Sequence, residues 1–259
     1  MDSPPLSVIL PVHDAGRFLD EAVASVAAQT AGDFELIAVD DGSSDDSPAR
    51  LAAWARRDSR IAVLRQDCLG VVAALNRGLA AARAPLVAIM HADDVARPDR
   101  FAKQRTYLAA HPEAALVGSA YEVVDAAGRR LKTVRPPTDP DVVGARLASG
   151  NCIAHPTVMA RREALLAAGG YRPAYVAAED YDLWLRLAER ARLANLPDVT
   201  LSYRRHGSTA SLRRFEQEVL CELAAQAAAR LRRRGEADPT GECAAITRAL
   251  LRRLGVGEE

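Results

Sequence analysis

The chain has 259 residues, 49% of them apolar, which is enough for one large α/β domain or one domain with an appendage. Its 34 acidic residues balance 34 lysines and arginines, so it lacks the positive field expected of a general nucleic-acid binder, and we expect no nucleic-acid partner. The four cysteines form no C-x-x-C pair. Together with the lack of a signal-like start or a long apolar run, this predicts a cytoplasmic protein with reduced thiols.

Short apolar runs alternate with amphipathic segments through the first 112 residues. The expected strands are 6–12, 34–39, 61–64 and 86–90, and the expected helices are 17–29, one starting near Pro48, and 71–83. Continuous apolar strands separated by helices indicate a parallel sheet that is covered on both faces.

The pattern changes after about residue 112. Segments 116–124 and 129–134 flank Asp125-Ala-Ala-Gly128, which predicts a hairpin. Helical patterns return at 141–148, 161–168 and 180–191, and a strand is expected to start near His155. From about residue 212 the chain is an Ala/Arg/Leu-rich helical tail, broken near 235–241.

Acidic residues follow three of the predicted strands. They occur in Val12-His13-Asp14, in the run 40–45 (D-D-G-S-S-D) and in the run 91–94 (H-A-D-D). Ligands of open α/β sheets bind beyond the carboxyl ends of the strands, so these residues should meet at one edge. Gathered carboxylates raise each other's pKa unless a cation compensates, and Mg²⁺ or Mn²⁺ carrying a diphosphate would do so.

A simpler role for such acids is to cap a helix N-terminus, and this alternative stays open for Asp14 and Asp45. The pairs Asp40-Asp41 and Asp93-Asp94 exceed what a cap requires. Neither G-x-G-x-x-G after the first strand nor a G-K-S or G-K-T run is present, so a metal is a better candidate than a glycine loop for holding phosphate.

These motifs resemble the family-2 glycosyltransferases of the GT-A fold. The resemblance covers roughly residues 5–212 and is carried by S-V-I-L-P-V-H-D (7–14), V-D-D-G-S-S-D (39–45), A-L-N-R-G-L (74–79), H-A-D-D-V-A-R-P-D-R (91–100), N-C-I-A-H-P-T-V-M (151–159), G-G-Y-R-P (169–173), A-E-D-Y-D-L-W-L-R-L (178–187) and Y-R-R-H-G-S-T-A-S (203–211). It implies a Rossmann-like mixed sheet with helices on both faces. The implied GT-A domain is 1–212, with a nucleotide half at about 1–112 and an acceptor half at about 113–212; residues 213–259 form a C-terminal helical appendage.

The resemblance also implies which residues bind the nucleotide. They are Pro11, Val12 and Asp14 in the loop beside base and ribose, Asp40 and Asp41 as the acidic pair that recognises the base, Gly70 and Asn76 at the helix under the nucleotide, and Asp93 as the last acid of a D-x-D metal motif.

One departure from the family pattern concerns the metal site. Where the family usually has D-A-D-D, this chain has His91-Ala92-Asp93-Asp94. His91 can ligate a metal but adds no negative charge. We therefore expect Mn²⁺ or Mg²⁺ to bind through Asp93 with weaker affinity, and it stays open whether His91 joins the site.

In the second half, the resemblance places the catalytic base at Asp180. A base must take the proton of the acceptor hydroxyl, and a carboxylate at a helix N-terminus is stabilised as an anion. Glu179, Asp94 and His155 are the expected sugar or acceptor contacts, and His206 is an expected metal or phosphate contact in a loop with Arg204 and Arg205. The alternatives are a first-turn charge at 179–180, a buried structural histidine at 155 and an ordinary loop residue at 206.

The resemblance thus implies a transferase that moves a sugar from a UDP- or dTDP-sugar to an acceptor hydroxyl with inversion, in cell-surface polysaccharide or glycoconjugate biosynthesis. The acceptor would be a saccharide, lipid-linked or other hydroxyl compound. Two alternatives are a nucleotidyltransferase, disfavoured because residues 13–17 are not a glycine-rich basic loop, and a catalytically weakened sugar-nucleotide-binding protein. The Arg-rich tail could dock on the anionic inner face of the cell membrane or on a partner, or it could pack an apolar face against the domain.

Overall fold

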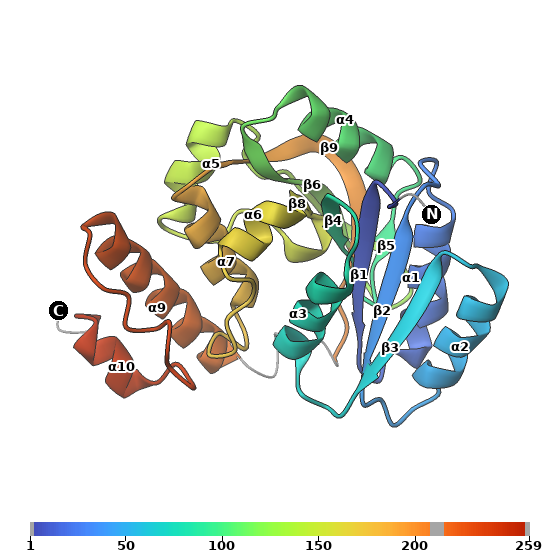
Figure 1. Ribbon diagram of the computed structural model, residues 1–259, viewed down its shortest axis with the longest axis horizontal. Coiled ribbons are helices and arrows are strands. Elements are labelled where there is room, and N and C mark those ends of the chain that lie inside the picture. Colours follow the sequence, from blue (N-terminus) through green and yellow to red (C-terminus); the bar gives the residue numbers. More distant parts are fainter. Residues whose placement is uncertain (1–2, 208–214, 257–259) are drawn as a thin grey trace.

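The computed structural model describes residues 3–207 and 215–256, which form a curved mixed sheet flanked by helices (Figure 1). The strand order is β3-β2-β1-β4-β8-β6-β9-β5, and β7 pairs with β6. The strands are β1 (Leu6–Val12), β2 (Glu35–Asp41), β3 (Ile61–Gln66), β4 (Leu86–Ile89), β5 (Val95–Ala96), β6 (Ala114–Val124), β7 (Arg130–Val134), β8 (Met159–Arg161) and β9 (Arg192–Arg204). The helices are α1 (Gly16–Ala27), α2 (Ser47–Arg57), α3 (Val71–Ala81), α4 (Arg100–Ala110), α5 (Pro140–Leu147), α6 (Arg162–Ala167), α7 (Glu179–Ala188), α9 (Phe215–Arg233) and α10 (Arg248–Arg253).

The first half is the parallel sheet that the apolar runs predict. β1 pairs in parallel with β2 and β4, and β2 pairs in parallel with β3. The register sets Val12 opposite Asp40, so the carboxyl ends of β1 and β2 are level. β2 extends further than predicted, and Asp40 and Asp41 are its last two residues.

Two apolar layers cover the two faces of this sheet. Along β1, Ile9 packs in the cluster that contains α3, while Val8 and Leu10 pack in the cluster that contains α1. Successive side chains of a strand point to opposite faces, so α3 and α1 lie on opposite sides. Gly78 lets α3 approach β1 closely, because a Cβ there would lie 2.5 Å from Ile9 Cγ2.

The second half departs from the parallel pattern. β8 runs antiparallel to both β4 and β6, and the expected hairpin is confirmed by the antiparallel pair β6 and β7. The long strand β9, parallel to β6 and antiparallel to β5, was not predicted. Pro197 and Asp198 interrupt its apolar pattern. The expected strand start near His155 was wrong, because His155–Thr157 form a single 3-10 turn and β8 begins at Met159.

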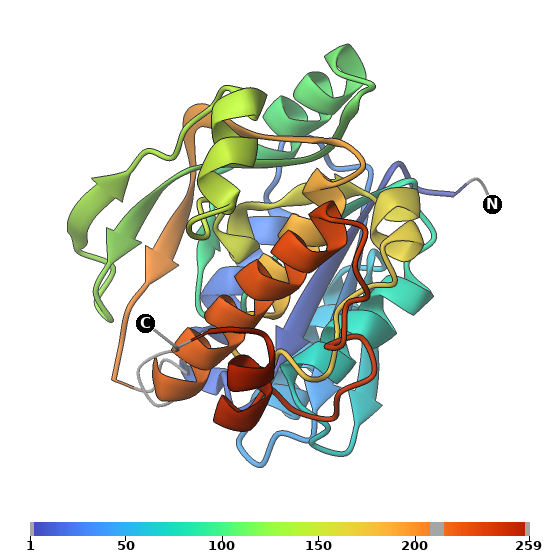
Figure 2. The same cartoon turned by 90° about the vertical axis from the view of Figure 1, so that its left-hand side faces the viewer.

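Of the C-terminal helices, α9 lies beside α7, and α10 packs against α9 (Figures 1 and 2). Small residues of α9, including Cys221 and Ala225, and the α10 residues Leu250 and Leu251 share an apolar cluster with Trp184 of α7. Motif residues 208–211 and the predicted boundary at 212–213 lie outside the described residues.

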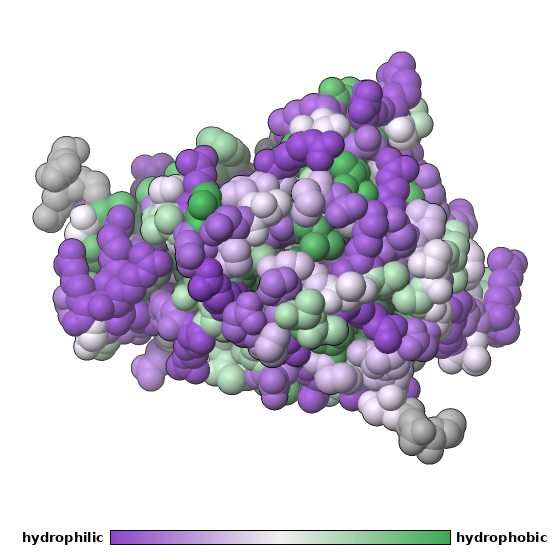
Figure 3. Space-filling view, turned by 90° about the horizontal axis from the view of Figure 1, so that it is seen from above, coloured by the Kyte–Doolittle hydropathy of each residue, from purple (hydrophilic) through white to green (hydrophobic). Residues whose placement is uncertain are grey.

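Among the described residues, no helix combines the length and apolar character required to cross a bilayer. On the face shown in Figure 3, polar residues predominate and apolar residues form small separate patches.

Candidate active site

The loops after β1 and β2 hold each other through acidic side chains. Asp14 Oδ1 accepts hydrogen bonds from the backbone N–H groups of Ser44 (2.7 Å) and Asp45 (3.2 Å), and the Ser44 bond is the main cause of a lowered pKa at Asp14. Asp45 accepts from the N–H of Gly16 at the start of α1 and of Ser47 at the start of α2, both at 2.9 Å. The capping alternative therefore fits Asp45, whereas Asp14 joins the two loops.

The acidic pair at the end of β2 divides into two roles. Asp41 Oδ1 accepts from Gln66 Nε2 (2.8 Å) and from the N–H of Leu69 (2.7 Å), and its Oδ2 accepts from the N–H of Gly70 (2.9 Å). Asp41 thus fixes the turn that begins α3, where Gly70 has a φ of +90°. Asp40 Oδ1 accepts from the N–H of Ser43, but its buried Oδ2 has no hydrogen bond within the described residues and lies 3.4 Å from Arg65 Nε. Asp40 is therefore the member of the pair with an oxygen that makes no hydrogen bond within the described residues, although Arg65 pairs with it.

Asn76 links the two halves of the sheet. Its Nδ2 donates to the Tyr171 carbonyl (2.8 Å), and its Oδ1 accepts from the Tyr171 N–H (2.9 Å). Gly170 allows this approach, because its φ is +66° and a Cβ there would lie 2.8 Å from Asn76 Oδ1. The side chain predicted to lie under the nucleotide thus also positions the G-G-Y loop of the second half.

The H-A-D-D segment after β4 gathers several ligand types. Atoms of His91, Asp93 and Asp94 that can bind a metal all lie within 4.8 Å of one another. Asp93 Oδ2 lies 3.0 Å from His206 Nε2, so the structure brings together the two residues expected to bind the metal. Asp94 Oδ1 accepts from the N–H of Arg204 (2.8 Å), while Asp94 Oδ2 is buried with no hydrogen-bond partner among the described residues.

Burial governs the charges in this segment. Asp94, expected to contact the sugar or acceptor, is only 1% exposed. Its burial and the Asp93 charge raise its pKa well above the ordinary value. Burial lowers the pKa of His91. The geometry makes Asp94 an inner member of the 91–94 group.

His155 lies in the interior beside this segment. Its Nδ1 is 3.3 Å from His91 Nε2, and its Nε2 is 2.9 Å from Tyr171 Oη. Burial lowers the pKa of His155 well below the ordinary histidine value, and the ring packs 5.8 Å from that of Trp184. This environment fits the structural alternative for His155 better than an acceptor contact.

Arg204 and His206, which are expected beside a diphosphate, both contact other parts of the protein. Arg204 is 3% exposed. It donates through Nε to the Asp93 carbonyl (2.9 Å) and through Nη2 to Glu21 (2.5 Å). Arg204 therefore fastens the end of β9 to residues 93–94. His206 packs its ring 4.8 Å from that of Phe18.

Asp180, the predicted base, is the second residue of α7. Its Oδ1 accepts from the N–H of Tyr181 (2.7 Å), and its Oδ2 accepts from Asn151 Nδ2 (2.9 Å). Burial, with a smaller contribution from the Glu222 charge of α9, raises the pKa of Asp180 from 3.8 to about 6. Glu179, the expected acceptor contact, is part-buried beside it. A carboxyl group that titrates near neutral pH is suited to general-base chemistry.

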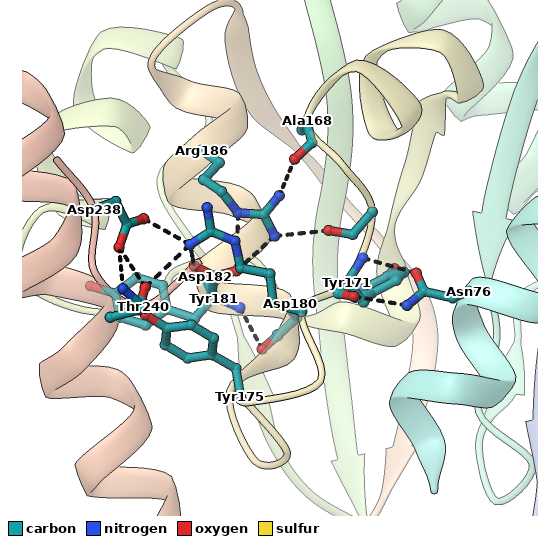
Figure 4. A network of polar contacts seen from close by, with 12 residues as sticks. Asn76, Ala168, Tyr171, Tyr175, Asp180, Tyr181, Asp182, Arg186, Asp238 and Thr240 are labelled. Carbon is teal, nitrogen blue, oxygen red and sulfur yellow. Dashed lines mark hydrogen bonds and ion pairs between the residues drawn. The ribbon is translucent and has the colours of Figure 1, made fainter. Parts of the chain in front are cut away.

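A network of ion pairs fixes the helix that carries Asp180 (Figure 4). Arg186 binds Asp182 one turn away (2.6 Å) and donates to the carbonyls of Gly170 (2.8 Å) and Ala168. Arg172 pairs with Asp182 (3.5 Å) and with Asp238 of the C-terminal segment (2.8 Å). The loop before α7, the helix itself and the C-terminal segment are thus joined.

Five contributors to this site were missed from the sequence. Asn151 and Tyr171 lie inside motifs that carry the resemblance, which was a usable signal. The i,i+4 spacing of Asp182 and Arg186 was also visible and typical of a helix ion pair. Glu222 gave no signal, because its approach to Asp180 depends on how α9 packs.

The curved mixed sheet, the acids at the ends of its parallel strands and the separate carboxylate on α7 define a GT-A glycosyltransferase. The model of the family described as "Glycosyl transferase family 2" matches residues 7–167. The chain belongs to this family, as its motifs predicted.

Similar sequences and structures agree with this assignment. The "O-antigen biosynthesis protein RfbC" of Myxococcus xanthus is 37% identical over 215 residues, which cover 82% of this chain but only 16% of RfbC. The "O-antigen biosynthesis glycosyltransferase WbnJ" of Escherichia coli is 30% identical over 208 residues, or 79% of this chain and 81% of WbnJ.

Solved structures confirm the GT-A fold. S. aureus TarS 1–349 in complex with UDP has a TM-score of 0.68 and 18% identity, covering 87% of this chain and 65% of that one. The mannosyltransferase PcManGT from Pyrobaculum calidifontis, in complex with GDP-Man and Mn²⁺, has a TM-score of 0.66 and 22% identity, covering 93% of this chain and 67% of that one.

Proposed function

We propose that this glycosyltransferase moves a sugar from a nucleoside-diphosphate sugar to an acceptor hydroxyl with inversion, and that Asp180 is the general base. The observation that carries this proposal is the environment of Asp180, whose pKa is raised to about 6 and whose Oδ2 is oriented by Asn151. A base with this pKa is ionised at neutral pH and remains basic enough to take a hydroxyl proton in the transition state.

The proposed reaction is a single displacement. As Asp180 takes the acceptor proton, the acceptor oxygen forms a bond to the anomeric carbon, and the bond from that carbon to the diphosphate oxygen breaks. Attack opposite the leaving group inverts the anomeric carbon. Asp182, Arg186 and Arg172 hold α7, so the base keeps its place during this step.

The donor is proposed to be a UDP- or dTDP-sugar. Asp40 Oδ2, which has no hydrogen bond within the described residues, could accept from the imide N–H of uracil or thymine. Pro11, Val12 and Asp14 border the same end of the sheet. The titles of similar structures name complexes with UDP, UDP-GlcNAc and GDP-Man, so a GDP-sugar belongs in the tests.

The 91–94 segment fits a divalent cation. Asp93 and Asp94 offer carboxylate oxygens and His91 offers a ring nitrogen, and these ligand atoms all lie within 4.8 Å of one another. The buried Asp94 Oδ2 has no hydrogen-bond partner among the described residues. Such donors suit Mn²⁺ or Mg²⁺. An ion bound there would offset charge on the leaving diphosphate. His206 would lie next to this ion, because its Nε2 is 3.0 Å from Asp93 Oδ2.

We further propose a role in cell-surface polysaccharide or glycoconjugate biosynthesis, with a saccharide, lipid-linked or other hydroxyl acceptor on the cytoplasmic side. The support is the naming of two similar proteins for O-antigen biosynthesis and of a third, AmsE of Erwinia amylovora, for amylovoran biosynthesis. The exposed Arg233, Arg252 and Arg253 of the C-terminal helices would be the contacts with an anionic membrane surface.

A donor screen tests the nucleotide and metal assignments. Thermal shifts are measured with UDP-, dTDP- and GDP-sugars, with and without Mn²⁺, for the wild type, Asp93→Ala and the matched surface control Asp33→Ala. We expect one donor class to stabilise the wild type and the control only with Mn²⁺, and Asp93→Ala to lose this response while remaining folded. Equal donor responses with and without Mn²⁺ in all three proteins would contradict the metal assignment. If the protein binds a donor but neither hydrolyses it nor transfers its sugar, the alternative of a catalytically weakened sugar-nucleotide-binding protein would be favoured.

A further inference from the structure

Position 91 carries an imidazole where the family usually has a carboxylate, and the structure orients its two nitrogens differently. His91 Nδ1 lies 3.8 Å from the buried Asp94 Oδ2. His91 Nε2 lies 3.3 Å from His155 Nδ1 in the interior. The Nδ1 side therefore faces the acidic group, and the Nε2 side faces the protein core.

The interior partner is itself held in place. His155 Nε2 contacts Tyr171 Oη at 2.9 Å, and both backbone polar groups of Tyr171 are bonded to the side chain of Asn76. His155 and Tyr171 are 6% and 2% exposed. His91 is thus backed by a buried polar chain that runs through His155 to Tyr171.

This chain is compatible with metal ligation by His91. A ligating imidazole nitrogen must be unprotonated, so the other nitrogen carries the proton and donates it to a second group. His91 Nε2–H can donate to His155 Nδ1, and His155 Nε2–H can donate to Tyr171 Oη. In this arrangement both contacts are satisfied, and the lone pair of His91 Nδ1 faces the carboxylates.

We propose that His91 Nδ1 is a metal ligand together with Asp93, and that this imidazole makes the site select transition-metal ions over Mg²⁺. The proposal rests on the metal-assisted transfer proposed above. Opposite ligands of one such ion, each at about 2.1 Å, are about 4.2 Å apart, so a group within 4.8 Å needs to contract only slightly. Mg²⁺ prefers oxygen ligands, whereas Co²⁺ and Zn²⁺ accept imidazole readily and Mn²⁺ tolerates it.

The first test uses metal ions alone as probes. Calorimetric titrations with Co²⁺, Mn²⁺ and Mg²⁺ compare the wild type with His91→Ala, His91→Asp and the surface control His111→Ala. We expect the wild type and the control to bind Co²⁺ and Mn²⁺ at least about tenfold more tightly than Mg²⁺, because Mg²⁺ prefers oxygen ligands. Loss of even an outer-shell partner costs about 10–100-fold in metal affinity, so His91→Ala should lose at least about tenfold in Co²⁺ affinity. His91→Asp should reduce the ratio of Co²⁺ affinity to Mg²⁺ affinity at least about tenfold.

Unchanged affinities and an unchanged ratio in both His91 variants, each checked for folding by circular dichroism, would overturn the proposal. His91→Asp keeps a polar side chain of modest size, so the test does not depend on the alanine variant alone.

The second test identifies the nitrogen directly. Pulsed electron paramagnetic resonance of bound Mn²⁺ should show ¹⁴N coupling in the wild type that is lost in His91→Ala. Tyr171→Phe removes the acceptor of the His155 N–H and should lower Mn²⁺ affinity about tenfold while the coupling remains. Coupling that persists in His91→Ala and disappears in His206→Ala would assign the nitrogen ligand to His206 and overturn the proposal.

The two proposals fail in different ways. A protein that transfers sugar with Mn²⁺ but binds metal equally well without His91 would refute only the ligand assignment. A protein that binds Mn²⁺ through His91 but neither hydrolyses nor transfers any sugar donor would refute the proposed function and support the ligand assignment.

Discussion

The Asp180 carboxylate experiences two opposing influences. Burial disfavours its charged form, and Glu222 of α9 adds to that effect, while hydrogen bonds from Asn151 and from the Tyr181 N–H favour the ion. Burial dominates, and the pKa rises to about 6. Burial also raises the pKa of the neighbouring Tyr171, and the charges of Asp180 and Glu179 add to that rise.

This environment predicts the pH dependence of transfer. The base must be ionised, so the rate of transfer should fall about tenfold for each pH unit below about 6 and reach a plateau above it.

The variant Asp180→Asn keeps the size of the side chain but cannot take a proton, and it should lose about 10²–10⁴ in turnover with donor affinity retained. Calorimetry measures the donor affinity, and pH–rate profiles of the wild type and the variant measure the turnover. Near wild-type turnover in the variant would move the base elsewhere, with Glu179 the next to test.

The same residue should weaken the fold at neutral pH. Because its pKa is higher in the folded chain than the ordinary value of 3.8, the folded state binds the proton more tightly than the unfolded state. The destabilisation therefore develops as the pH rises from about 4 to about 6. Asp180→Asn should raise the free energy of unfolding at pH 8 by on the order of 1–3 kcal/mol, and by less at pH 4. Chemical denaturation at both pH values measures this, and a less stable variant at pH 8 would contradict it.

At the scale of elements, several polar connections meet on α7. Arg186 ties it to the loop at 168–170, and Asp182 pairs with Arg172. Asp238 extends the network into the C-terminal segment, accepting from Arg172 (2.8 Å) and Arg232 (2.6 Å). The helix that carries the proposed base is thus clamped by segments that precede and follow it in the chain.

Asp238→Asn should weaken the contacts between the C-terminal segment and α7, and so destabilise the fold. Burial opposes ionisation of Asp238, but hydrogen bonds from Thr240, Arg172 and Arg232 hold its pKa well below the ordinary value. The variant removes the carboxylate that Arg172 and Arg232 share, while Arg172 keeps Asp182 (3.5 Å) and Arg232 keeps Glu189 (2.8 Å). The free energy of unfolding at pH 7 should therefore fall by about 1–3 kcal/mol, the cost of losing hydrogen bonds to a charged group. Because the carboxylate stabilises the fold only when ionised, the gap should narrow as the pH is lowered below about 4. A constant gap between pH 7 and pH 3 would show that the charge is not responsible.

At the scale of the whole molecule, contacts between distant segments join the two halves of the sheet. The buried Arg100 donates to the carbonyls of Ile89 (2.8 Å) and Val158 (3.1 Å). Gln104 donates to the carbonyls of Val117 (3.0 Å) and Thr157 (2.7 Å). These side chains of α4 tie the parallel half to the antiparallel strands.

We expect the chain to unfold in one cooperative transition despite its predicted C-terminal appendage. Leu250, Leu251 and Cys221 belong to the same apolar cluster as Trp184, so separating the C-terminal helices would expose the core around α7. Differential scanning calorimetry should give equal calorimetric and van't Hoff enthalpies. A separate early transition, with hydrogen exchange first in residues 215–256, would show instead that the appendage is an independent unit.

Local pattern alone determined the parallel half of this protein. The apolar runs predicted β1, β2, β3 and β4 and the helices between them within a few residues. The strands β1, β2 and β4 are buried on both faces and are therefore apolar through their middle. The edge strand β3 is partly exposed, and only its short apolar run at 61–64 predicted it. The turn residues Asp125 and Gly128 predicted the β6–β7 hairpin for an equally local reason. The acids at the strand ends were visible because parallel strands bring their carboxyl ends to one edge.

Only the tertiary structure decided which role each of these acidic residues has. The sequence could not distinguish Asp41, whose oxygens fix the turn before α3, from Asp40, which keeps one oxygen unbonded within the described residues. It gave no sign that β9 is a strand, because the pairing of β9 with β6 and β5 substitutes for local periodicity. The raised pKa of Asp180 depends on burial and on Glu222 of a helix far along the chain. Burial and partners are properties of the assembled fold, and segments distant in sequence supply them.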